Sequence, residues 1–412
     1  MLSPRAARLA GLATLAFVVM VSYGLVRPPV ESLFLAEYTS RALPWAWLAV
    51  AASMAGVVAL YSRRVVRTDL ATLFGQVVAV TLTLLALLLA ARRGHVPGAT
   101  FLLYVWKDVY VVVLVEVFWS FANSVFDLRT ARWAYGLFGV MSSLGGAVAG
   151  VLTGRLAPLL GSAQLPFAVF PVLGVAWALT RWLARHADPL SVAPKAALPS
   201  FADGFALLKK SAYLPYIFAL ISLVQVVITL VDYQFNYLAE RQFPLVDQRA
   251  GALGNVYAAI DAGAMILHVL TPPVLRALGV TGTLFSIPAV LGAGLVSFLV
   301  APRFAVIAAV KVLAKAFDYS LFRNAKELLY LPLDYDEKTR GKAFADMLSY
   351  RVAKGGASLV LLGLAAVAAP PFAAAALALS LIAGWLGVTA AIARRYRALT
   401  DPPAKMSAPP AL

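Results

Sequence analysis

The chain of 412 residues is 62% hydrophobic and only 13% charged, and its mean hydropathy is +0.83. Soluble globular domains average roughly 45–50% apolar and about 25% charged residues, so this composition excludes a soluble protein and indicates a polytopic membrane protein. The formal net charge of +16 falls mostly in predicted cytoplasmic loops, where membrane insertion explains it, so we expect no nucleic-acid partner. The absence of Cys excludes a disulfide scaffold, a thiolate metal site and a Cys nucleophile.

Apolar runs long enough to cross a bilayer core of about 30 Å recur along the whole chain. The runs are continuous rather than alternating, which favours helices over a closed barrel. We therefore predict an all-α polytopic membrane protein with twelve transmembrane helices, near residues 9–26, 43–61, 70–91, 99–124, 134–158, 164–184, 213–238, 251–273, 280–300, 303–325, 342–369 and 371–393.

The distribution of Lys and Arg predicts that both termini are cytoplasmic, because most loop cations then share the side of Arg5 and Arg8. The first span has no small-residue cleavage pattern and is interpreted as retained. We expect a multi-pass protein of a bacterial inner membrane, in contact with the lipid bilayer. The main exceptions to the charge rule, which fall on the opposite side, are Arg41, Arg92, Arg93, Arg155, Arg241, Arg249 and Arg303.

Six predicted helices precede the longest polar break and six follow it. The break contains three prolines and an amphipathic piece at residues 201–210 that could lie on the membrane surface. Short matches at an offset near 200–210 residues, such as SLFLAEYTS at 32–40 with FNYLAERQF at 235–243, indicate duplicated halves. Parallel six-helix repeats with a site between them are typical of major-facilitator transporters. We predict an N-terminal six-helix bundle (1–185), a cytoplasmic linker (186–212), a C-terminal six-helix bundle (213–398) and a disordered cytoplasmic tail (399–412).

Ionisable side chains recur inside the predicted helices, where each costs at least about 2.5–3.5 kcal/mol and normally serves a transport pathway. Lys311, Lys315 and Asp318 are spaced to share one helical face. Some of the charges could neutralise one another, such as Lys107 with Asp108 or Lys315 with Asp318, but the set is rich in cations. The full set is Arg27, Glu31, Lys107, Asp108, Glu116, Asp232, Asp261, His268, Lys311, Lys315, Asp318, Asp346, Arg351 and Lys354.

An anionic solute would supply the missing negative charge. Lys is a compact donor to phosphate and Arg a bidentate one, so a phosphorylated or carboxylated small molecule fits best. The acidic residues could bind protons, or release the substrate by competing for the cations.

The stretch DYSLFRNAKELLYLPLDYDEKTRGKAFADMLSYRVAKGGASL, residues 318–359, resembles the signature of the ATP/ADP translocase family of plastids and intracellular bacteria. FWSFAN at 118–123 and the sequence around Tyr23 and Arg27 are similar to two further family segments. After that arginine the family has an Asp-Thr-Lys-Asp-like run, whereas this chain has Pro28-Pro29-Val30-Glu31 and lacks the first-helix Lys.

The resemblance implies a twelve-helix carrier that exchanges nucleotides by alternating access, with charged intramembrane residues needed for transport. On the same basis, Asp232 stands where the family has an acid in helix seven, and Lys354 matches the Lys before its paired glycines. Several other residues match the signature but lie in or near a cytoplasmic loop, where gating or folding is the expected role; they are Lys326, Glu327, Lys338, Gly341 and Lys342.

We therefore hypothesise a secondary transporter of an organic phosphate, exchanging nucleotides of the ATP and ADP type. The chain has no G-x-x-x-x-G-K-[ST] loop, so a nucleotide would be cargo and no enzyme activity is expected. We expect no cofactor, no metal site and a monomer. Expected substrate-binding residues are Lys354, Arg351, Lys311, Lys315, Lys107, Arg27, Asn123 and Tyr319; expected coupling or gating residues are Asp232, Asp108, Glu116, Asp261, Asp318, Lys326 and Glu327.

Two alternatives stay open at this point. The first is a proton-coupled carrier of another solute, with Asp232, Asp261 and His268 as the relay. The second is a membrane scaffold that has kept the fold but does not transport. Uptake driven by an imposed pH gradient without counter-substrate would favour the first, and a stable partner without any nucleotide binding would favour the second.

Overall fold

A computed structural model describes residues 4–65, 68–125, 128–186 and 201–400, and its regular elements over these ranges are helices. The first six are α1 (Pro4–Tyr38), α2 (Leu43–Val65), α3 (Leu70–Arg93), α4 (Ala99–Val125), α5 (Leu128–Leu160) and α6 (Val169–His186). The next seven are α7 (Phe201–Lys210), α8 (Leu214–Gln242), α9 (Val246–Val300), α10 (Phe304–Phe317), α11 (Arg323–Leu329), α12 (Lys342–Ala366) and α13 (Ala373–Thr400). Short 3-10 helices η1 (Ser40–Ala42) and η2 (Leu165–Ala168) and π-helices η3 (Asp318–Phe322) and η4 (Glu337–Gly341) connect them.

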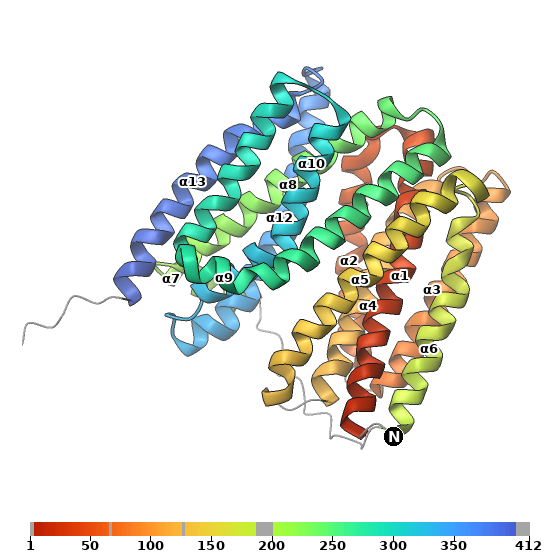
Figure 1. Ribbon diagram of the computed structural model, residues 1–412, viewed down its shortest axis with the longest axis horizontal. Coiled ribbons are helices and arrows are strands. Elements are labelled where there is room, and N and C mark those ends of the chain that lie inside the picture. Colours follow the sequence, from red (N-terminus) through yellow and green to blue (C-terminus); the bar gives the residue numbers. More distant parts are fainter. Residues whose placement is uncertain (1–3, 66–67, 126–127, 187–200, 401–412) are drawn as a thin grey trace, which may run out of the picture.

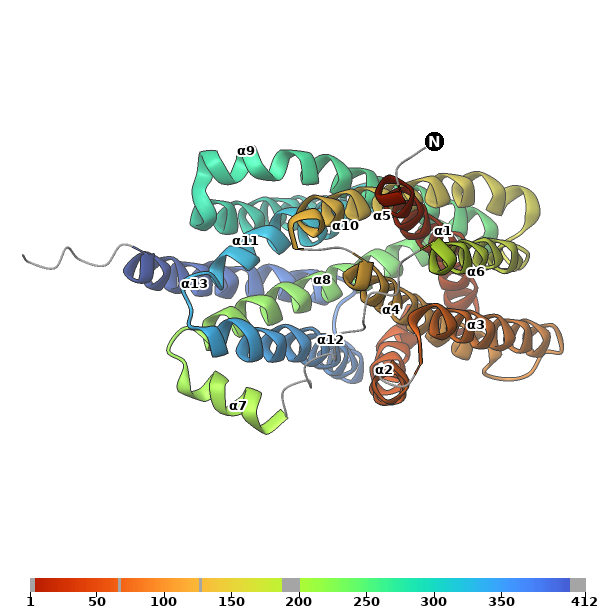
Figure 2. The same ribbon diagram turned by 90° about the horizontal axis from the view of Figure 1, so that it is seen from below.

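Within the described ranges these helices make twelve membrane crossings, as predicted. Helix α9 turns back on itself at Gly279, whose φ of 66° favours glycine, so its 55 residues supply two successive crossings (Figure 2). Helices α10, η3 and α11 follow one another and supply one crossing. The predicted amphipathic piece forms the separate helix α7, while the predicted linker residues 187–200 and the tail from 401 lie outside the described residues.

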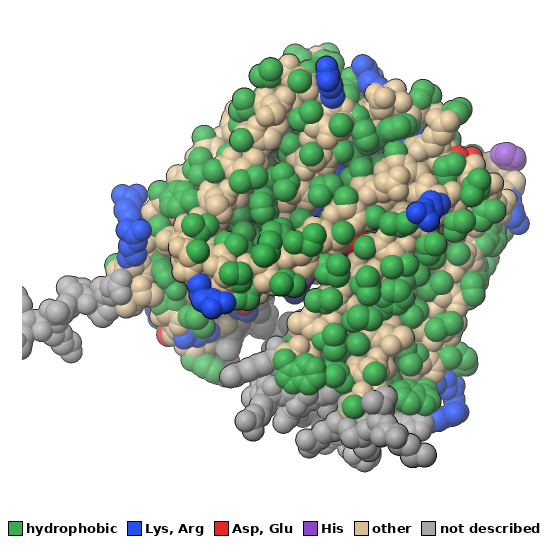
Figure 3. All heavy atoms as spheres, in the orientation of Figure 1, with side chains coloured by type: hydrophobic (Ala, Val, Ile, Leu, Met, Phe, Trp, Pro, Cys, Tyr) green, Lys and Arg blue, Asp and Glu red, His purple; other side chains and the backbone are tan. Residues whose placement is uncertain are grey.

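Helices α1–α6 lie on one side of the molecule and α8–α13 on the other, with both chain ends at the same end of the bundle (Figure 1). Seven helices of the described ranges, with α9 counted once, are long and apolar enough to cross a membrane by composition alone. The face drawn in Figure 3 is covered largely by hydrophobic side chains. Such a surface is stable against lipid, and it agrees with the membrane assignment.

Helices α5 and α9 join the two sides through very close backbone contact. A Cβ atom on Gly150 would lie 2.7 Å from both the Gly254 carbonyl oxygen and the Ala258 backbone nitrogen. Small residues permit such approach, and in membranes they favour helix association because backbones can pack directly. This crossing places α9 beside α1 and α5 at the centre of the molecule (Figure 1).

The end of the bundle opposite the chain termini is held shut by hydrogen bonds between the two sides, and we call it the closed end. The Arg249 guanidinium donates to the Ser32 hydroxyl (3.0 Å) and carbonyl (3.1 Å). The Ser40 backbone N–H donates to Glu240 at 2.8 Å, and the Ser162 N–H donates to Asp247 at 2.6 Å. These contacts link α1, η1 and the α5–η2 connection to α8 and α9.

Helix α1 is longer than predicted, because it continues through Pro28 and Pro29 to Tyr38 instead of ending near residue 26. Proline cannot donate to the carbonyl four residues earlier, so Pro28 leaves the Gly24 carbonyl without its helical partner. The Thr153 hydroxyl of α5 donates to that carbonyl at 3.1 Å. Neighbouring side chains commonly satisfy such freed groups in transmembrane helices. As a result, Arg27 and Glu31 lie inside the bundle rather than at a helix end.

Candidate functional site

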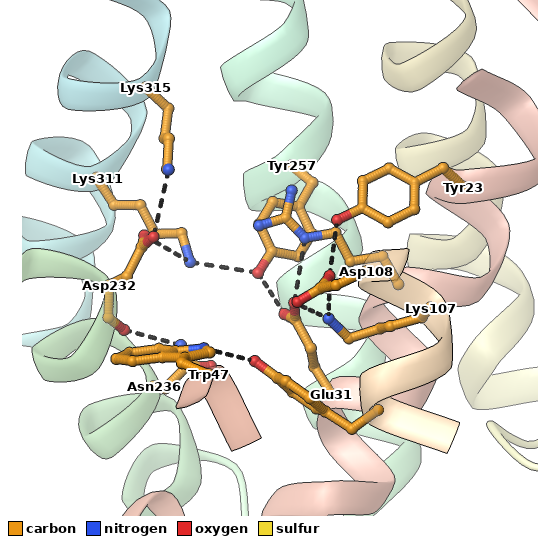
Figure 4. Close-up of polar contacts among 12 residues, drawn as sticks. Tyr23, Glu31, Trp47, Lys107, Asp108, Asp232, Asn236, Tyr257, Lys311 and Lys315 are labelled. Carbon is orange, nitrogen blue, oxygen red and sulfur yellow. Dashed lines mark hydrogen bonds and ion pairs between the residues drawn. The ribbon is translucent and has the colours of Figure 1, made fainter. Parts of the chain in front are cut away.

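Charged and aromatic side chains from both sides of the molecule meet at its centre (Figure 4). Helices α1, α4, α8, α9, α10 and α12 each contribute to this group. We call it the central cluster, and it consists of Tyr23, Arg27, Glu31, Lys107, Asp108, Asp232, Tyr257, Lys311, Lys315 and Lys354.

On the first side of the cluster, Glu31 is the shared acceptor. Its Oε1 atom lies 3.1 Å from Arg27 Nε and 3.2 Å from Lys107 Nζ. Lys107 also pairs with Asp108 at 2.7 Å, and the Tyr23 hydroxyl donates to Asp108 at 3.2 Å. The pairing of Lys107 with its neighbour Asp108 is therefore part of a larger network that includes α1.

On the second side, Asp232 of α8 lies between the two lysines of α10. Lys311 Nζ is 3.3 Å from Oδ1 of this carboxylate and Lys315 Nζ is 3.4 Å from Oδ2. The Tyr257 hydroxyl of α9 accepts from Lys311 at 3.2 Å and donates to Glu31. Tyr257 thus connects the two halves of the charge network.

Aromatic rings cover the cations of the cluster. The Lys107 ammonium lies 3.9 Å from the Tyr104 ring centroid, and the Lys311 ammonium lies 3.9 Å from that of Phe235. The Arg27 guanidinium lies 3.8 Å from the Tyr257 ring. A cation over a ring face gains electrostatic attraction that is larger where water is excluded. The rings therefore help to keep positive charge inside the membrane without a full set of carboxylates.

The cluster contains more cations than anions. Its five cations, Arg27, Lys107, Lys311, Lys315 and Lys354, face three carboxylates, Glu31, Asp108 and Asp232; Asp261, one turn beyond Tyr257, adds at most a fourth. Lys354 has no carboxylate within 4 Å among the described residues, and its ammonium lies 5.8 Å from the Trp47 ring. Since unpaired charge is costly inside a membrane, this arrangement favours an anionic ligand.

Side chains of the cluster differ in their accessibility. Lys107 and Lys311 are 1% exposed, whereas Arg27, Asp232 and Lys315 are 15–20% exposed. The buried Lys107 and Lys311 can provide a fixed positive electrostatic potential, while the more exposed Arg27, Asp232 and Lys315 can exchange ion-pair partners. Asn236, one turn after Asp232, has a buried side-chain oxygen without a hydrogen-bond partner and offers a further acceptor.

A second charged group lies at the turn between α11 and α12, and we call it the turn cluster: Lys326, Glu327, Tyr330, Lys342 and Asp346. Lys326 pairs with Asp346 at 2.9 Å and lies 3.8 Å from Glu327, which also pairs with Lys342. The Tyr330 hydroxyl donates to Asp346 at 3.0 Å. Two cations and two carboxylates balance each other here, within one side of the molecule.

Several residues expected to bind substrate, or to act in coupling or gating, lie outside the central cluster. Asn123 accepts from Tyr135 near the end of α4, and Glu116 is exposed on the same helix. Asp318, the first residue of the π-helix η3, accepts from Gln225 at 2.9 Å instead of pairing with Lys315, which pairs with Asp232 of α8. Tyr319 is 38% exposed on η3 and near enough to Arg27 to interact electrostatically.

Two further expected residues need separate description. Asp261 faces α5, where a Cβ on Gly146 would lie 2.2 Å from its Oδ2, and His268 faces the same helix near Gly139. Arg351 belongs to α12, but its side chain lies outside the described residues. Among the described residues, no group of three or more His, Asp or Glu side chains could hold a metal ion.

Sequence reasoning did not select Glu31, Tyr257 or Trp47 as site residues. Glu31 follows Arg27 by four residues, a spacing that pairs side chains along a helix, but the first span was predicted to end near residue 26, before both residues. Tyr257 and Trp47 carried no signal, because aromatic residues are common throughout the hydrophobic helices.

Comparison with known proteins relates most of the chain to a family of transporters. The family model described as TLC ATP/ADP transporter matches residues 100–168 and 184–396, which is more than half of the chain. The ADP,ATP carrier protein 1 of Chlamydia muridarum is 28% identical over 333 residues, which cover 69% of this chain and 62% of that protein. The chloroplastic ADP,ATP carrier protein 1 of Arabidopsis thaliana is 26% identical over 63% of this chain and 47% of its own length. The chain thus spans less than two thirds of the length of these relatives.

Solved structures give the fold. A variant of the nucleoside transporter NupG superposes with a TM-score of 0.67 at 12% identity, over 95% of this chain and 99% of that one. The POT family transporter PepTSo superposes with a TM-score of 0.66 at 12% identity, over 97% and 99% of the two chains. The expected all-helical major-facilitator architecture is confirmed. The chain belongs to the TLC ATP/ADP transporter family, a family of multi-pass membrane transporters and not of enzymes.

Proposed function

We propose that this protein exchanges phosphorylated nucleotides of the ATP and ADP type across a membrane by alternating access. The observation that carries the proposal is the excess of cations in the central cluster, between helices of both sides of the molecule. Relatives named as ADP,ATP carriers support nucleotides as the cargo. The proposed site lies between an N-terminal and a C-terminal six-helix bundle, as in other carriers of this architecture.

The cluster offers phosphate the donors that it prefers. Lys315 and Lys354 are point-charge donors, and Arg27 can donate to two phosphate oxygens at once. Arg27 and Lys315 are partly exposed, and Lys354 has no carboxylate partner within 4 Å among the described residues, so a phosphate can reach all three without first disrupting Lys107 or Lys311. We assign phosphate binding to Arg27, Lys315 and Lys354.

The carboxylates of the cluster provide a means of release. Without substrate, Asp232 pairs with both Lys311 and Lys315, and Glu31 pairs with both Arg27 and Lys107. A bound phosphate competes for the same cations, so binding exchanges ion pairs with the carboxylates for ion pairs with the phosphate. This competition suits an exchanger, which must bind its cargo and also let it leave.

Contacts at the closed end support the proposed alternation. Arg249 with Ser32 and Ser40 with Glu240 hold the two sides together there, and exchange requires these hydrogen bonds to break in the opposite state. We assign the closed end to the non-cytoplasmic side from the placement of Lys and Arg. The turn cluster, at the end of the chain termini, is proposed to make and break its ion pairs as a gate.

Lys354 gives a clean test, because its removal leaves no carboxylate stranded within 4 Å among the described residues. Loss of one charge-assisted contact to phosphate is worth about 1.5–3 kcal/mol, so Lys354→Gln should bind ATP about 10–100-fold more weakly. Thermal-shift titrations with a panel of nucleotides and other phosphorylated metabolites would be followed by exchange of labelled ATP in liposomes. Lys210→Gln, an exposed lysine on α7, is the matched control.

Wild-type ATP binding and exchange in the Lys354→Gln protein would refute the assignment. A stronger response to another phosphorylated metabolite would change the proposed substrate but leave the proposed binding site unchanged. Absence of any ligand response, together with a partner protein that stays bound on purification, would favour the scaffold alternative.

Proton coupling is the second candidate, and Asp261 favours it. No hydrogen-bond or ion-pair partner is found for this carboxylate among the described residues, and it lies at the α5–α9 crossing between the two sides. A proton bound there would remove a charge from the contact between α5 and α9. Uptake of labelled ATP driven by a pH gradient into liposomes without internal nucleotide, and lost in Asp261→Asn, would support this candidate.

A further inference from the structure

A cavity of about 520 Å³ lies at the closed end, beside the hydrogen bond between Ser40 and Glu240. Its polar rim comes from both sides of the molecule: Ser40 and Arg41 from η1, and Tyr233, Tyr237, Glu240 and Arg241 from α8. The remaining wall is mainly apolar and comes from residues 361–374, where α12 ends and α13 begins. The cavity is separate from the central cluster, and none of its lining residues belongs to that cluster.

The two arginines of the rim have no carboxylate partner. No Asp or Glu of the described residues lies within 4 Å of Arg41 or Arg241, and the one carboxylate of the rim, Glu240, accepts from the Ser40 N–H. The Arg241 guanidinium lies 4.5 Å from the centroid of the Tyr237 ring. Both arginines belong to the set that departs from the charge rule, so membrane insertion does not explain them.

The backbone at the rim is strained in a way that fixes this geometry. Thr39 has φ 60° and ψ 170°, a region occupied almost only by glycine, and threonine is β-branched. This conformation directs the next N–H, of Ser40, at Glu240 and brings Arg41 to the cavity. Strain of this kind persists where the surrounding structure enforces it, and it gathers at ligand-binding sites.

We propose that this cavity binds a phosphate group at the closed end, held by Arg41 and Arg241. Guanidinium groups match phosphate oxygens in pairs, and the tyrosine rings add a face for an attached organic group. The phosphate has two possible sources: a soluble phosphorylated compound, or the headgroup of an anionic lipid whose chains lie along the apolar wall. Because Ser40 and Glu240 belong to the rim, occupancy is linked to the contact that holds the closed end shut.

The site can be tested apart from transport. The full chain, in nanodiscs of phosphatidylcholine, would be titrated with pyrophosphate by calorimetry, both as wild type and with Lys354→Gln to weaken the central cluster. Arg41→Gln combined with Arg241→Gln should weaken pyrophosphate binding at least about tenfold in either background. Arg303→Gln, an exposed arginine at the start of α10, is the control and should bind as its parent does.

A second arm identifies the source of the phosphate. Adding phosphatidylglycerol to the nanodiscs should raise the unfolding temperature of the wild type more than that of the double variant if the ligand is a lipid headgroup. If the ligand is soluble, only the pyrophosphate titration should respond to the two arginines. Arg41→Lys with Arg241→Lys should retain part of the binding, which separates loss of charge from misfolding.

The proposal is overturned if the double variant matches Arg303→Gln in both the titration and the lipid response. Failure of ATP exchange in Lys354→Gln does not test the proposed phosphate site, because binding to the cavity is measured directly by pyrophosphate titration. Conversely, loss of pyrophosphate binding at the two arginines leaves the proposed function of the central cluster intact.

Discussion

The central cluster and the turn cluster are both groups of charged side chains, but they are built differently: the central cluster lies inside the bundle, whereas Glu327 of the turn cluster is 43% exposed. The central cluster draws on helices of both sides of the molecule and holds five cations against at most four carboxylates. The turn cluster comes from α11, α12 and the turn between them, and it holds two cations against two carboxylates. A balanced group needs no outside partner, whereas an unbalanced one in a membrane is completed by a counter-ion. The balance between cations and carboxylates therefore distinguishes a cluster with a structural or gating role from one that binds substrate.

The largest effect is expected from Asp232→Asn, which removes a carboxylate from the central cluster at constant shape. Lys311 and Lys315 lose the carboxylate that they share, so a bound nucleotide has less competition and should bind at least as tightly as to wild type. Release should become slow, and exchange should fall about tenfold or more. The measurements are the ATP Kd by calorimetry and the exchange of labelled ATP in liposomes.

The matched control is Asp346→Asn in the turn cluster, which should leave the ATP Kd unchanged. Loss of ATP binding in Asp232→Asn would show that this carboxylate supports the ligand directly. The proposed difference between the central cluster, which binds substrate through its excess of cations, and the balanced turn cluster would then be wrong.

A smaller effect is expected from Lys326→Gln, which strands Asp346 in the turn cluster. Lys326 is 6% exposed but Asp346 is 25% exposed, so water offsets part of the loss and we expect destabilisation of about 1–2 kcal/mol. Thermal unfolding of the purified protein would measure it, with ATP affinity unchanged. The double variant Lys326→Gln with Asp346→Asn should recover part of the stability, because the stranded charge is removed as well.

Lys338→Gln, on the exposed part of the same turn, serves as the control and should unfold like wild type. If Lys326→Gln instead weakened ATP binding as strongly as Lys354→Gln, the turn cluster would have to be counted as part of the substrate site.

The smallest effect is expected from Thr153→Val, which removes the hydroxyl that satisfies the Gly24 carbonyl below Pro28. Hydrogen bonds between transmembrane helices average about 0.6 kcal/mol, so the unfolding temperature should fall only slightly. Because α1 positions Arg27 and Glu31, ATP affinity should fall a few-fold as well. Thr14→Val, which removes a hydroxyl bonded within α1 itself, is the control and should leave affinity unchanged. Equal affinity in both variants would show that this bond does not position the cluster.

Hydrophobic runs were sufficient to predict twelve crossings and the amphipathic helix α7, because apolar length and periodicity are local properties of the chain. The intramembrane lysines Lys107, Lys311 and Lys315 were also recognisable from sequence, since charge inside an apolar run has few explanations. Prediction from local sequence was wrong where a contact with another helix changed the length of a helix. The first span was predicted to end near residue 26, but Thr153 of α5 satisfies the carbonyl that Pro28 leaves without a partner, and α1 continues to Tyr38.

Lys107 pairs with its neighbour Asp108, and Arg27 pairs with Glu31 four residues later, but the pairs that join different helices depended on tertiary structure. Helical spacing placed Lys311, Lys315 and Asp318 on one face, yet the two lysines pair with Asp232 of α8 and Asp318 turns to Gln225. Glu31 and Tyr257 are 226 residues apart, and no periodicity relates them.

The sequence by itself determined that this protein crosses the membrane in helices, that it carries excess positive charge within them, and that residues 318–359 resemble nucleotide carriers. Those properties follow from composition and from short-range order. Only the tertiary structure decided which carboxylates neutralise which cations, and that Arg41 and Arg241 stand unpaired at a cavity. The physical reason is that an ion pair depends on distances of a few ångströms between helices, and these are set by packing such as the contact of Gly150 with Gly254.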